Sequence, residues 1–192
     1  MTSPAIAESS PSPRALLGSL VDYPPGGGLL MYGGYDATEE LADTWAWTGT
    51  NWKQLNPANS PGPLDPGLAY VSGLHEVVLF GGYDGLLWHG DTWVFKNNNW
   101  NIIFPPRSPI GRAGFGFAGI GSKAVIFGGY NNGDYYGDTW TFDGTTWRPG
   151  PSGPDPRSAM GLTLDSRNHD VVLFGGRNQN TGQYFGDTWT LG

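Results

Sequence analysis

A glycine doublet that follows a short apolar run occurs four times in this chain at nearly constant spacing. The doublets begin at Gly33, Gly81, Gly128 and Gly175, so successive copies are separated by 48, 47 and 47 residues. Repeats of this length are typical of architectures in which no unit buries its apolar face alone. The repeat therefore predicts one array of four stacked or radially arranged units.

Each repeat reads as four short strands. The run before the doublet forms the second strand, and an Asp-Thr-Trp motif opens the third, as in Thr92-Trp93-Val94-Phe95, which alternates as a half-buried strand does. A tight Asn- or Gly-containing turn follows. A fourth strand then carries another tryptophan, at Trp52, Trp100 and Trp147. The expected first strands are Ala15–Val21, Leu68–Ser72, Ala113–Gly119 and Ala159–Leu164, and no segment has the period of a helix.

Four antiparallel strands in about 47 residues are typical of a propeller blade. The Gly-Gly doublets, the tyrosines after them and the two tryptophans of each unit make the chain similar to the kelch-repeat family. The resemblance implies an all-β fold, a β-propeller of four kelch-type four-stranded antiparallel blades in a single domain, 1–192. Its repeats are expected at about 13–55, 64–104, 111–148 and 156–191. Two departures are Arg177 in place of the aromatic residue, and a fourth unit that stops at Gly192 before a fourth strand.

The position of the first repeat suggests how a ring could close. Residues 3–7 (Ser-Pro-Ala-Ile-Ala) stand where the outer strand of the last blade is expected. We therefore expect this segment to close the propeller, which would remove an exposed sheet edge. A four-bladed monomer, an eight-bladed ring of two chains and a fragment of a longer array all remain open, so the chain is expected to be a monomer or a homodimer.

Composition narrows the classes of partner. The formal net charge is −7, which disfavours binding to the phosphates of a nucleic acid. The longest apolar runs have about four residues, far fewer than the ~20 of a membrane span, so no membrane partner is expected. The chain has no cysteine and no recognisable signal peptide. The localisation is therefore unknown: cytoplasmic as the sequence stands, or secreted if the first methionine was added to a mature domain.

A binding face is expected where the loops between second and third strands meet the starts of the inner strands. In kelch domains that bind peptides, arginines at those starts and residues after the doublet line the binding mouth. By resemblance, Arg14, Arg112, Arg157 and Arg177 would form a basic ring, with Gly67 in the arginine's place in the second blade. The alternative is that these arginines only bind loop carbonyl groups. The other candidate ligand-binding residues are Tyr35, Tyr83, Tyr130, Trp88, His89, Tyr135, Tyr136, Asn178, Tyr184 and Phe185.

Catalytic patterns are weak in this sequence. His75, His89 and His169 belong to different repeats, and His89 is expected on the face opposite the other two, so no metal site is expected. No phosphate loop or Ser-His-Asp signature is present, and no cofactor is expected. We therefore expect a non-catalytic module that recognises a peptide, a protein or a glycan on the loop face around the central channel. The alternatives are an enzyme of cyclase, isomerase or lyase type that uses the channel mouth, and a structural module that assembles into a larger propeller.

Overall fold

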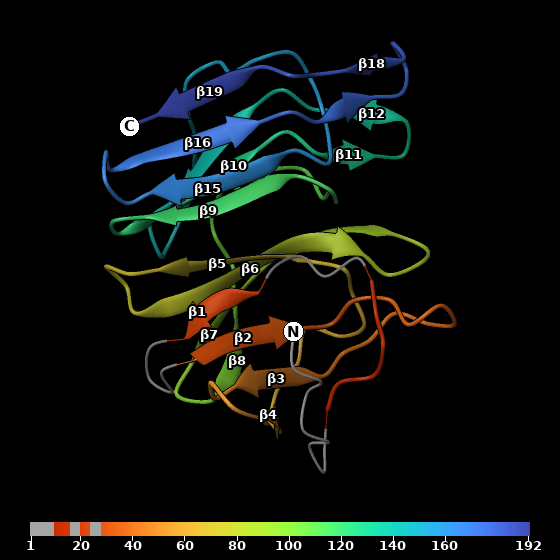
Figure 1. The fold of residues 1–192 in the computed structure, drawn as a ribbon, viewed down its shortest axis with the longest axis vertical. Helices are drawn as coiled ribbons and strands as arrows, with labels where there is room; N and C mark the ends of the chain where they lie inside the picture. Colours follow the sequence, from red (N-terminus) through yellow and green to blue (C-terminus); the bar gives the residue numbers. More distant parts are fainter. Residues whose placement is uncertain (1–9, 16–19, 24–27) are drawn as a thin grey trace.

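The computed structural model describes residues 10–15, 20–23 and 28–192 (Figure 1). These residues form four antiparallel sheets arranged as a four-blade β-propeller. Blade 1 consists of β1 (Val21–Tyr23), β2 (Gly28–Tyr32), β3 (Thr44–Trp47) and β4 (Trp52–Leu55). Blade 2 consists of β5 (Gly67–Val71), β6 (Glu76–Tyr83), β7 (Trp88–Lys96) and β8 (Asn99–Ile103).

The third and fourth blades each carry an extra hairpin. Blade 3 consists of β9 (Gly116–Ile120), β10 (Lys123–Phe127), β13 (Thr139–Phe142) and β14 (Trp147–Pro149), and blade 4 of β15 (Gly161–Asp165), β16 (Asp170–Phe174) and β19 (Thr188–Leu191). The two-stranded hairpins lie in the loops between second and third strands; they are β11 (Tyr130–Asn131) with β12 (Asp134–Tyr135), and β17 (Arg177–Asn178) with β18 (Gln183–Tyr184).

The blades follow one another in sequence order. Their inner strands pack consecutively, β1 against β5, β5 against β9 and β9 against β15. Figure 1 shows the first and fourth blades at opposite ends of the long axis, with the extra hairpins projecting on the right. Closure of the propeller by residues 3–7 stays a prediction, because these residues lie outside the described ranges.

Apolar cores lie between neighbouring blades, as the repeat length predicts. The interface of blades 1 and 2 buries Leu30 and Tyr32 against Leu79 and Trp100, and the interface of blades 2 and 3 repeats this arrangement around Trp147. The smaller core of blades 3 and 4 buries Ala118, Val125 and Val171. The outer-strand tryptophans Trp100 and Trp147 are 0% and 1% exposed. These two residues therefore belong to the core between blades, as expected.

The glycine doublet has a conformational cause. Both residues of the first doublet have positive φ, 65° at Gly33 and 96° at Gly34, and the other three doublets repeat this geometry. Residues other than glycine rarely adopt positive φ values. In blades 1, 3 and 4 the second strand ends directly before the doublet, whereas in blade 2 the doublet shifts the register between β6 and β7 and β6 continues to Tyr83.

The strands agree with the sequence prediction in type and order. β5 lies within one residue of the expected strand, whereas β9 and β15 begin two or three residues later than expected. The first expected strand shares Val21 with β1, and its residues 16–19 lie outside the described ranges. The short hairpins β11–β12 and β17–β18 were not predicted. No helix among the described residues is long and apolar enough to cross a membrane.

Candidate functional site: the loop face

Backbone hydrogen bonds bring two kinds of loop together at one face of the propeller. The amide of Gly82, near the end of β6 in blade 2, donates to the carbonyl group of Arg112 at the start of blade 3 (2.9 Å). Gly129 and Arg157 make the same contact between blades 3 and 4 (2.9 Å). We call this side of the molecule the loop face, and the candidate binding residues were expected to lie there.

Three of the predicted arginines are held within the scaffold. Arg112 is 1% exposed; its guanidinium group donates to Asp138 at 2.5 and 3.1 Å and to the carbonyl group of Gly128 at 3.0 Å. The indole of Trp140 donates to the same carboxylate at 2.6 Å. An arginine, an aspartate and a tryptophan thus form one polar unit, in which the arginine is buried and the aspartate is partly exposed.

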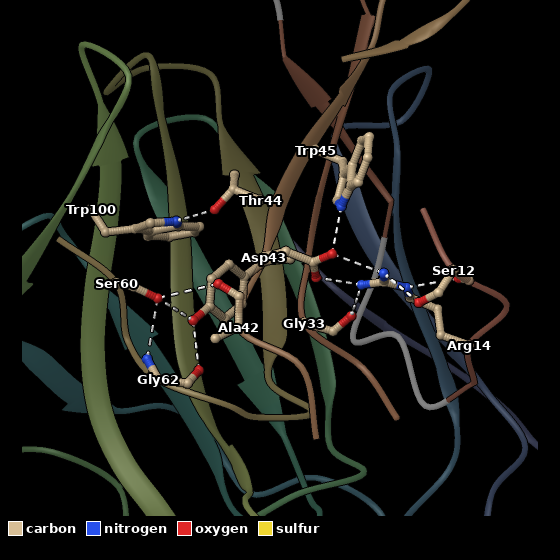
Figure 2. A network of polar contacts seen from close by, with 11 residues as sticks. Ser12, Arg14, Gly33, Ala42, Asp43, Thr44, Trp45, Ser60, Gly62 and Trp100 are labelled. Atoms are coloured by element: carbon tan, nitrogen blue, oxygen red, sulfur yellow. Dashed lines mark hydrogen bonds and ion pairs between the residues drawn. The ribbon is translucent and has the colours of Figure 1, made fainter. Parts of the chain in front are cut away.

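The same unit recurs in blades 1 and 4. Figure 2 shows Arg14 donating to both oxygens of Asp43, at 2.5 and 2.9 Å, with the indole of Trp45 on that carboxylate at 2.6 Å. Arg157, Asp187 and Trp189 make these contacts in blade 4. The hydrogen bonds from Arg157 and Trp189 lower the pKa of Asp187 to about 2.

These hydrogen bonds limit the binding of a ligand by the three arginines. A guanidinium group binds a ligand carboxylate through two parallel hydrogen bonds. Arg14, Arg112 and Arg157 already make such bidentate pairs with aspartates of their own blades. Arg177, in contrast, is exposed. These contacts agree with the scaffold interpretation of the first three arginines.

Blade 2 departs from this pattern. Ala113 and Asp65 make equivalent backbone bonds, to the carbonyl groups of Tyr130 and Tyr83, so the arginine position of blade 2 is occupied by the buried Leu64. The prediction that Gly67 stands in the arginine's place was wrong by three residues. The segment before β5 has no arginine, so the sequence offered no marker for this position. Without an arginine, Asp91 is exposed.

The indole nitrogen of Trp93 shows the consequence of this substitution. It is buried and has no hydrogen-bond partner among the described residues. The corresponding nitrogen in the other three blades donates to the aspartate two residues earlier. Blade 2 therefore lacks the Arg–Asp–Trp hydrogen bonds that the other three blades share.

His89 lies in blade 2, beside Asp91, the aspartate that has no arginine partner there. Its Nε2 atom is 2.7 Å from a carboxylate oxygen of Asp84, and its Nδ1 atom is 3.8 Å from Asp91. The other Asp84 oxygen accepts the backbone N–H groups of Leu86 and Leu87, as expected for an Asx turn. These backbone bonds and the contact with His89 lower the pKa of Asp84 to about 2.

Two further carboxyl groups near blade 2 are shifted in the opposite direction. Burial raises the pKa of Asp65 to about 6, although the amide of Tyr83 donates to it at 2.6 Å. Burial and the charge of Asp84 also raise the pKa of Glu40, one of whose oxygens is buried without a partner among the described residues. The loop face between blades 1 and 2 therefore concentrates negative charge.

Four predicted aromatic residues form a continuous row across blades 2 and 3. The ring centroids of Tyr83 and Trp88 are 4.7 Å apart, those of Trp88 and Tyr130 are 5.9 Å apart, and those of Tyr130 and Tyr135 are 5.0 Å apart. All four side chains are half-buried. We call this set the aromatic row.

Three exposed aliphatic residues stand close to Trp88 in the chain or next to a segment whose backbone approaches it. Leu86 and Leu87 precede Trp88 in the chain and are 81% and 64% exposed. Ile110, also exposed, is next to Gly111, whose backbone lies against the carbonyl group of Trp88. A group of large apolar side chains on one face of a protein commonly marks a surface that binds a partner.

The remaining candidates are divided between the scaffold and blade 4. Tyr136 and Phe185 stack under Arg112 and Arg157, at 4.0 and 3.6 Å from guanidinium carbon to ring centroid, and Asn178 donates to the carbonyl group of Pro156. In blade 1, Tyr35 pairs with Ala15 through its backbone. Arg177, Tyr184 and Phe185 line a shallow depression of about 440 Å³ beside Phe174.

Sequence reasoning missed several residues that matter here. Asp65 was not singled out, because its burial depends on the contact between blades. Leu86 and Leu87 were also overlooked, although two adjacent leucines after Asp-Gly in a turn are a recognisable signal. Within the described residues, no group of three or more His, Asp or Glu side chains could hold a metal ion.

The fold and the loop face define a four-blade β-propeller as the class of this protein. No protein-family model matches the chain, and no curated protein matches it. The kelch family therefore stays a prediction from the repeated residues.

Proposed function

We propose that this protein, a kelch-type propeller, is a non-catalytic recognition module whose loop face binds an extended peptide segment of another protein. The observation that carries the proposal is the aromatic row, together with the exposed Leu86 and Leu87 that directly precede Trp88 in the chain. Aromatic anchors that are already packed lose little conformational freedom when a partner binds, and such residues commonly supply most of the binding energy.

Charge around the aromatic row supports one kind of peptide. Asp84 lies beside Leu86 and Leu87, Asp91 follows His89, and Asp134 is exposed beside Tyr135. Complementary charge improves both the rate and the specificity of association. The proposed ligand is therefore a peptide with one or two large apolar residues flanked by lysine or arginine.

Selection from a random peptide library tests this proposal. Peptides selected on the full chain should be rich in aromatic or aliphatic residues beside lysine or arginine. Replacing Leu86 and Leu87 by serine should weaken their binding about tenfold or more, because two apolar contacts are lost. Neither side chain is buried, so the unfolding midpoint should stay unchanged.

A control variant separates the aromatic row of blades 2 and 3 from exposed apolar surface elsewhere. Phe174→Ser removes another exposed side chain, 59% exposed, from blade 4. This change should leave the binding of the selected peptides unaffected. Peptides that bind both variants as tightly as the unaltered protein would contradict the proposal, as would a library that gives no binders while a panel of neutral oligosaccharides does.

A further inference from the structure

In three blades, an arginine before the inner strand reaches the aspartate of the Asp-Thr-Trp motif in the same blade. The guanidinium groups of Arg14, Arg112 and Arg157 each donate to both oxygens of that aspartate. The backbone amides of Arg112 and Arg157 donate to the carbonyl groups of His89 and Tyr136 in the preceding blade. These amide bonds mark the arginine position independently of its side chain.

A leucine stands at this position in blade 2. The amide of Leu64 donates to the carbonyl group of Leu41 in blade 1 at 3.1 Å, which is the bond that marks the position. Leu64 is buried in the core of blades 1 and 2, and its side chain has no hydrogen-bond donor. Within the part of the chain that the structure describes, Asp91 pairs with no lysine or arginine.

The aspartate of blade 2 is the most accessible of the four equivalent aspartates. The side chain of Asp91 is 58% exposed, against 23%, 41% and 39% for Asp43, Asp138 and Asp187. The buried indole nitrogen of Trp93 has no partner among the described residues, whereas its equivalents donate to those three aspartates. Blade 2 thus keeps an acceptor and a donor whose usual partners are missing.

His89 stands where two other blades have a ring that stacks on the arginine. Tyr136 and Phe185, each two residues before the aspartate, have ring centroids 4.0 and 3.6 Å from the guanidinium carbons of their arginines. His89 is likewise two residues before Asp91, and its Nδ1 atom lies 3.8 Å from that carboxylate. Blade 2 therefore has the carboxylate and a planar ring but lacks the guanidinium group.

We propose that Asp91 binds the guanidinium group of an arginine in the peptide that the loop face recognises. The guanidinium group makes a bidentate pair with Asp91 and lies against the ring of His89. Arginine is favoured over lysine because its planar group forms two parallel hydrogen bonds and stacks, whereas an ammonium group acts as a point charge. The inference rests on the proposed function for the source of this arginine, since Asp91 is three residues after Trp88 of the aromatic row.

A small probe tests the site without a peptide. N-acetyl-arginine amide is added to the isotope-labelled full-length chain, and the backbone amide signals are followed by NMR. The signals of residues 89–93 should shift saturably, and N-acetyl-lysine amide should bind about threefold more weakly or worse. Asp91→Asn should weaken binding of the arginine probe about threefold to tenfold. The matched control Asp155→Asn, at an exposed carboxylate between blades 3 and 4, should have no effect.

A second variant supplies the missing group from within the chain. The guanidinium group introduced by Leu64→Arg should pair with Asp91 as Arg112 pairs with Asp138, and binding of the arginine probe should weaken about threefold or more. The control Leu64→Met keeps an apolar side chain of similar volume and should bind the probe as the unaltered protein does. Unfolding midpoints are measured alongside, and the Asp91→Asn comparison decides if Leu64→Arg does not fold.

Three results would overturn the inference: no saturable shift at residues 89–93, equal binding of the arginine and lysine probes, or full binding by the Asp91→Asn variant. Selected peptides that keep their affinity when every arginine is replaced by lysine would also contradict it, while leaving the proposed function intact. Conversely, a chain that binds the arginine probe through Asp91 but selects no apolar peptide would support the guanidinium site and contradict the proposed function.

Discussion

The indole N–H of Trp147 donates a 2.9 Å hydrogen bond to the hydroxyl group of Thr92, and this bond joins the outer strand of blade 3 to the third strand of blade 2. Both residues are buried, so neither can exchange this partner for water. The contact shows why the fourth-strand tryptophan and the threonine of the Asp-Thr-Trp motif recur together in the sequence.

A double-mutant cycle should reveal this pairing. We expect Trp147→Phe to lower the free energy of unfolding by about 2–4 kcal/mol, through the lost volume and the unpaired hydroxyl group. Thr92→Val should cost about 1–3 kcal/mol because the indole N–H is left buried and unpaired. Denaturant unfolding of the double variant should show less than the sum of the two losses; strict additivity would mean that the bond contributes nothing.

Replacing a buried arginine should destabilise the protein more than replacing an exposed one. Arg157→Met leaves Asp187 and the carbonyl group of Gly175 without their donor, and we expect a loss of about 2–4 kcal/mol. The control is Arg177→Met, an exposed change expected to cost no more than about 0.5 kcal/mol. Thermal or denaturant unfolding measures both, and equal losses would rule out the ion pair with Asp187 as the reason why arginine stands at position 157.

Blade 2 allows a comparison between two equivalent tryptophans. Trp140 donates to Asp138, whereas the buried nitrogen of Trp93 has no partner among the described residues. Replacing Trp140 by phenylalanine removes a hydrogen bond, but the same change at Trp93 removes an unsatisfied donor. We therefore expect Trp140→Phe to be the more destabilising of the two by about 1–3 kcal/mol in the free energy of unfolding. The opposite order would show that Trp93 has a partner.

Asp65 should make stability depend on pH. Burial raises its pKa to about 6, above the value near 4 of an unfolded chain, so the folded protein holds this proton more tightly. Its contribution favours folding below about pH 4 and is lost as the pH rises through 6. Asp65→Asn can still accept the bond from Tyr83, and it should stabilise the protein by about 1–2 kcal/mol at pH 7.5 but hardly at pH 4.

The matched control for this substitution is Asp155→Asn, at an exposed carboxylate. Unfolding free energies of both variants are measured at pH 4 and 7.5, each relative to the unaltered protein. The control should stay within about 0.5 kcal/mol at both values. A stabilisation from Asp65→Asn that is the same at both pH values would contradict the raised pKa.

Local patterns account for most of the predicted fold. The Gly33-Gly34 turn and the alternation from Thr92 to Phe95 depend on backbone conformation and strand periodicity, both of which the sequence displays. The starts of β9 and β15 were placed too early, because Ala113 and Ser158 pair with the hairpin residues Tyr130 and Arg177 as isolated bridges instead of extending the blade strand.

The candidate site was harder to predict because it depends on contacts between repeats. Arg112 and Asp138 are 26 residues apart, and only the folded blade brings them into an ion pair. The four aromatic residues of the row were among the predicted binding residues, and the structure shows that they lie next to one another. Their role in binding stays a prediction. The burial of Asp65 arises from a neighbouring blade, so no short sequence pattern predicts it.

The most direct test of the account is the footprint of a selected peptide on the full-length protein, measured by amide hydrogen exchange. If the peptide binds at the aromatic row, exchange should slow at residues 83–88, 110–112 and 130–135, which surround the row. Protection of these segments should be lost when Leu86 and Leu87 are both replaced by serine. Protection confined to blade 1 or to the opposite face of the propeller would contradict the assignment of the loop face of blades 2 and 3 as the recognition surface.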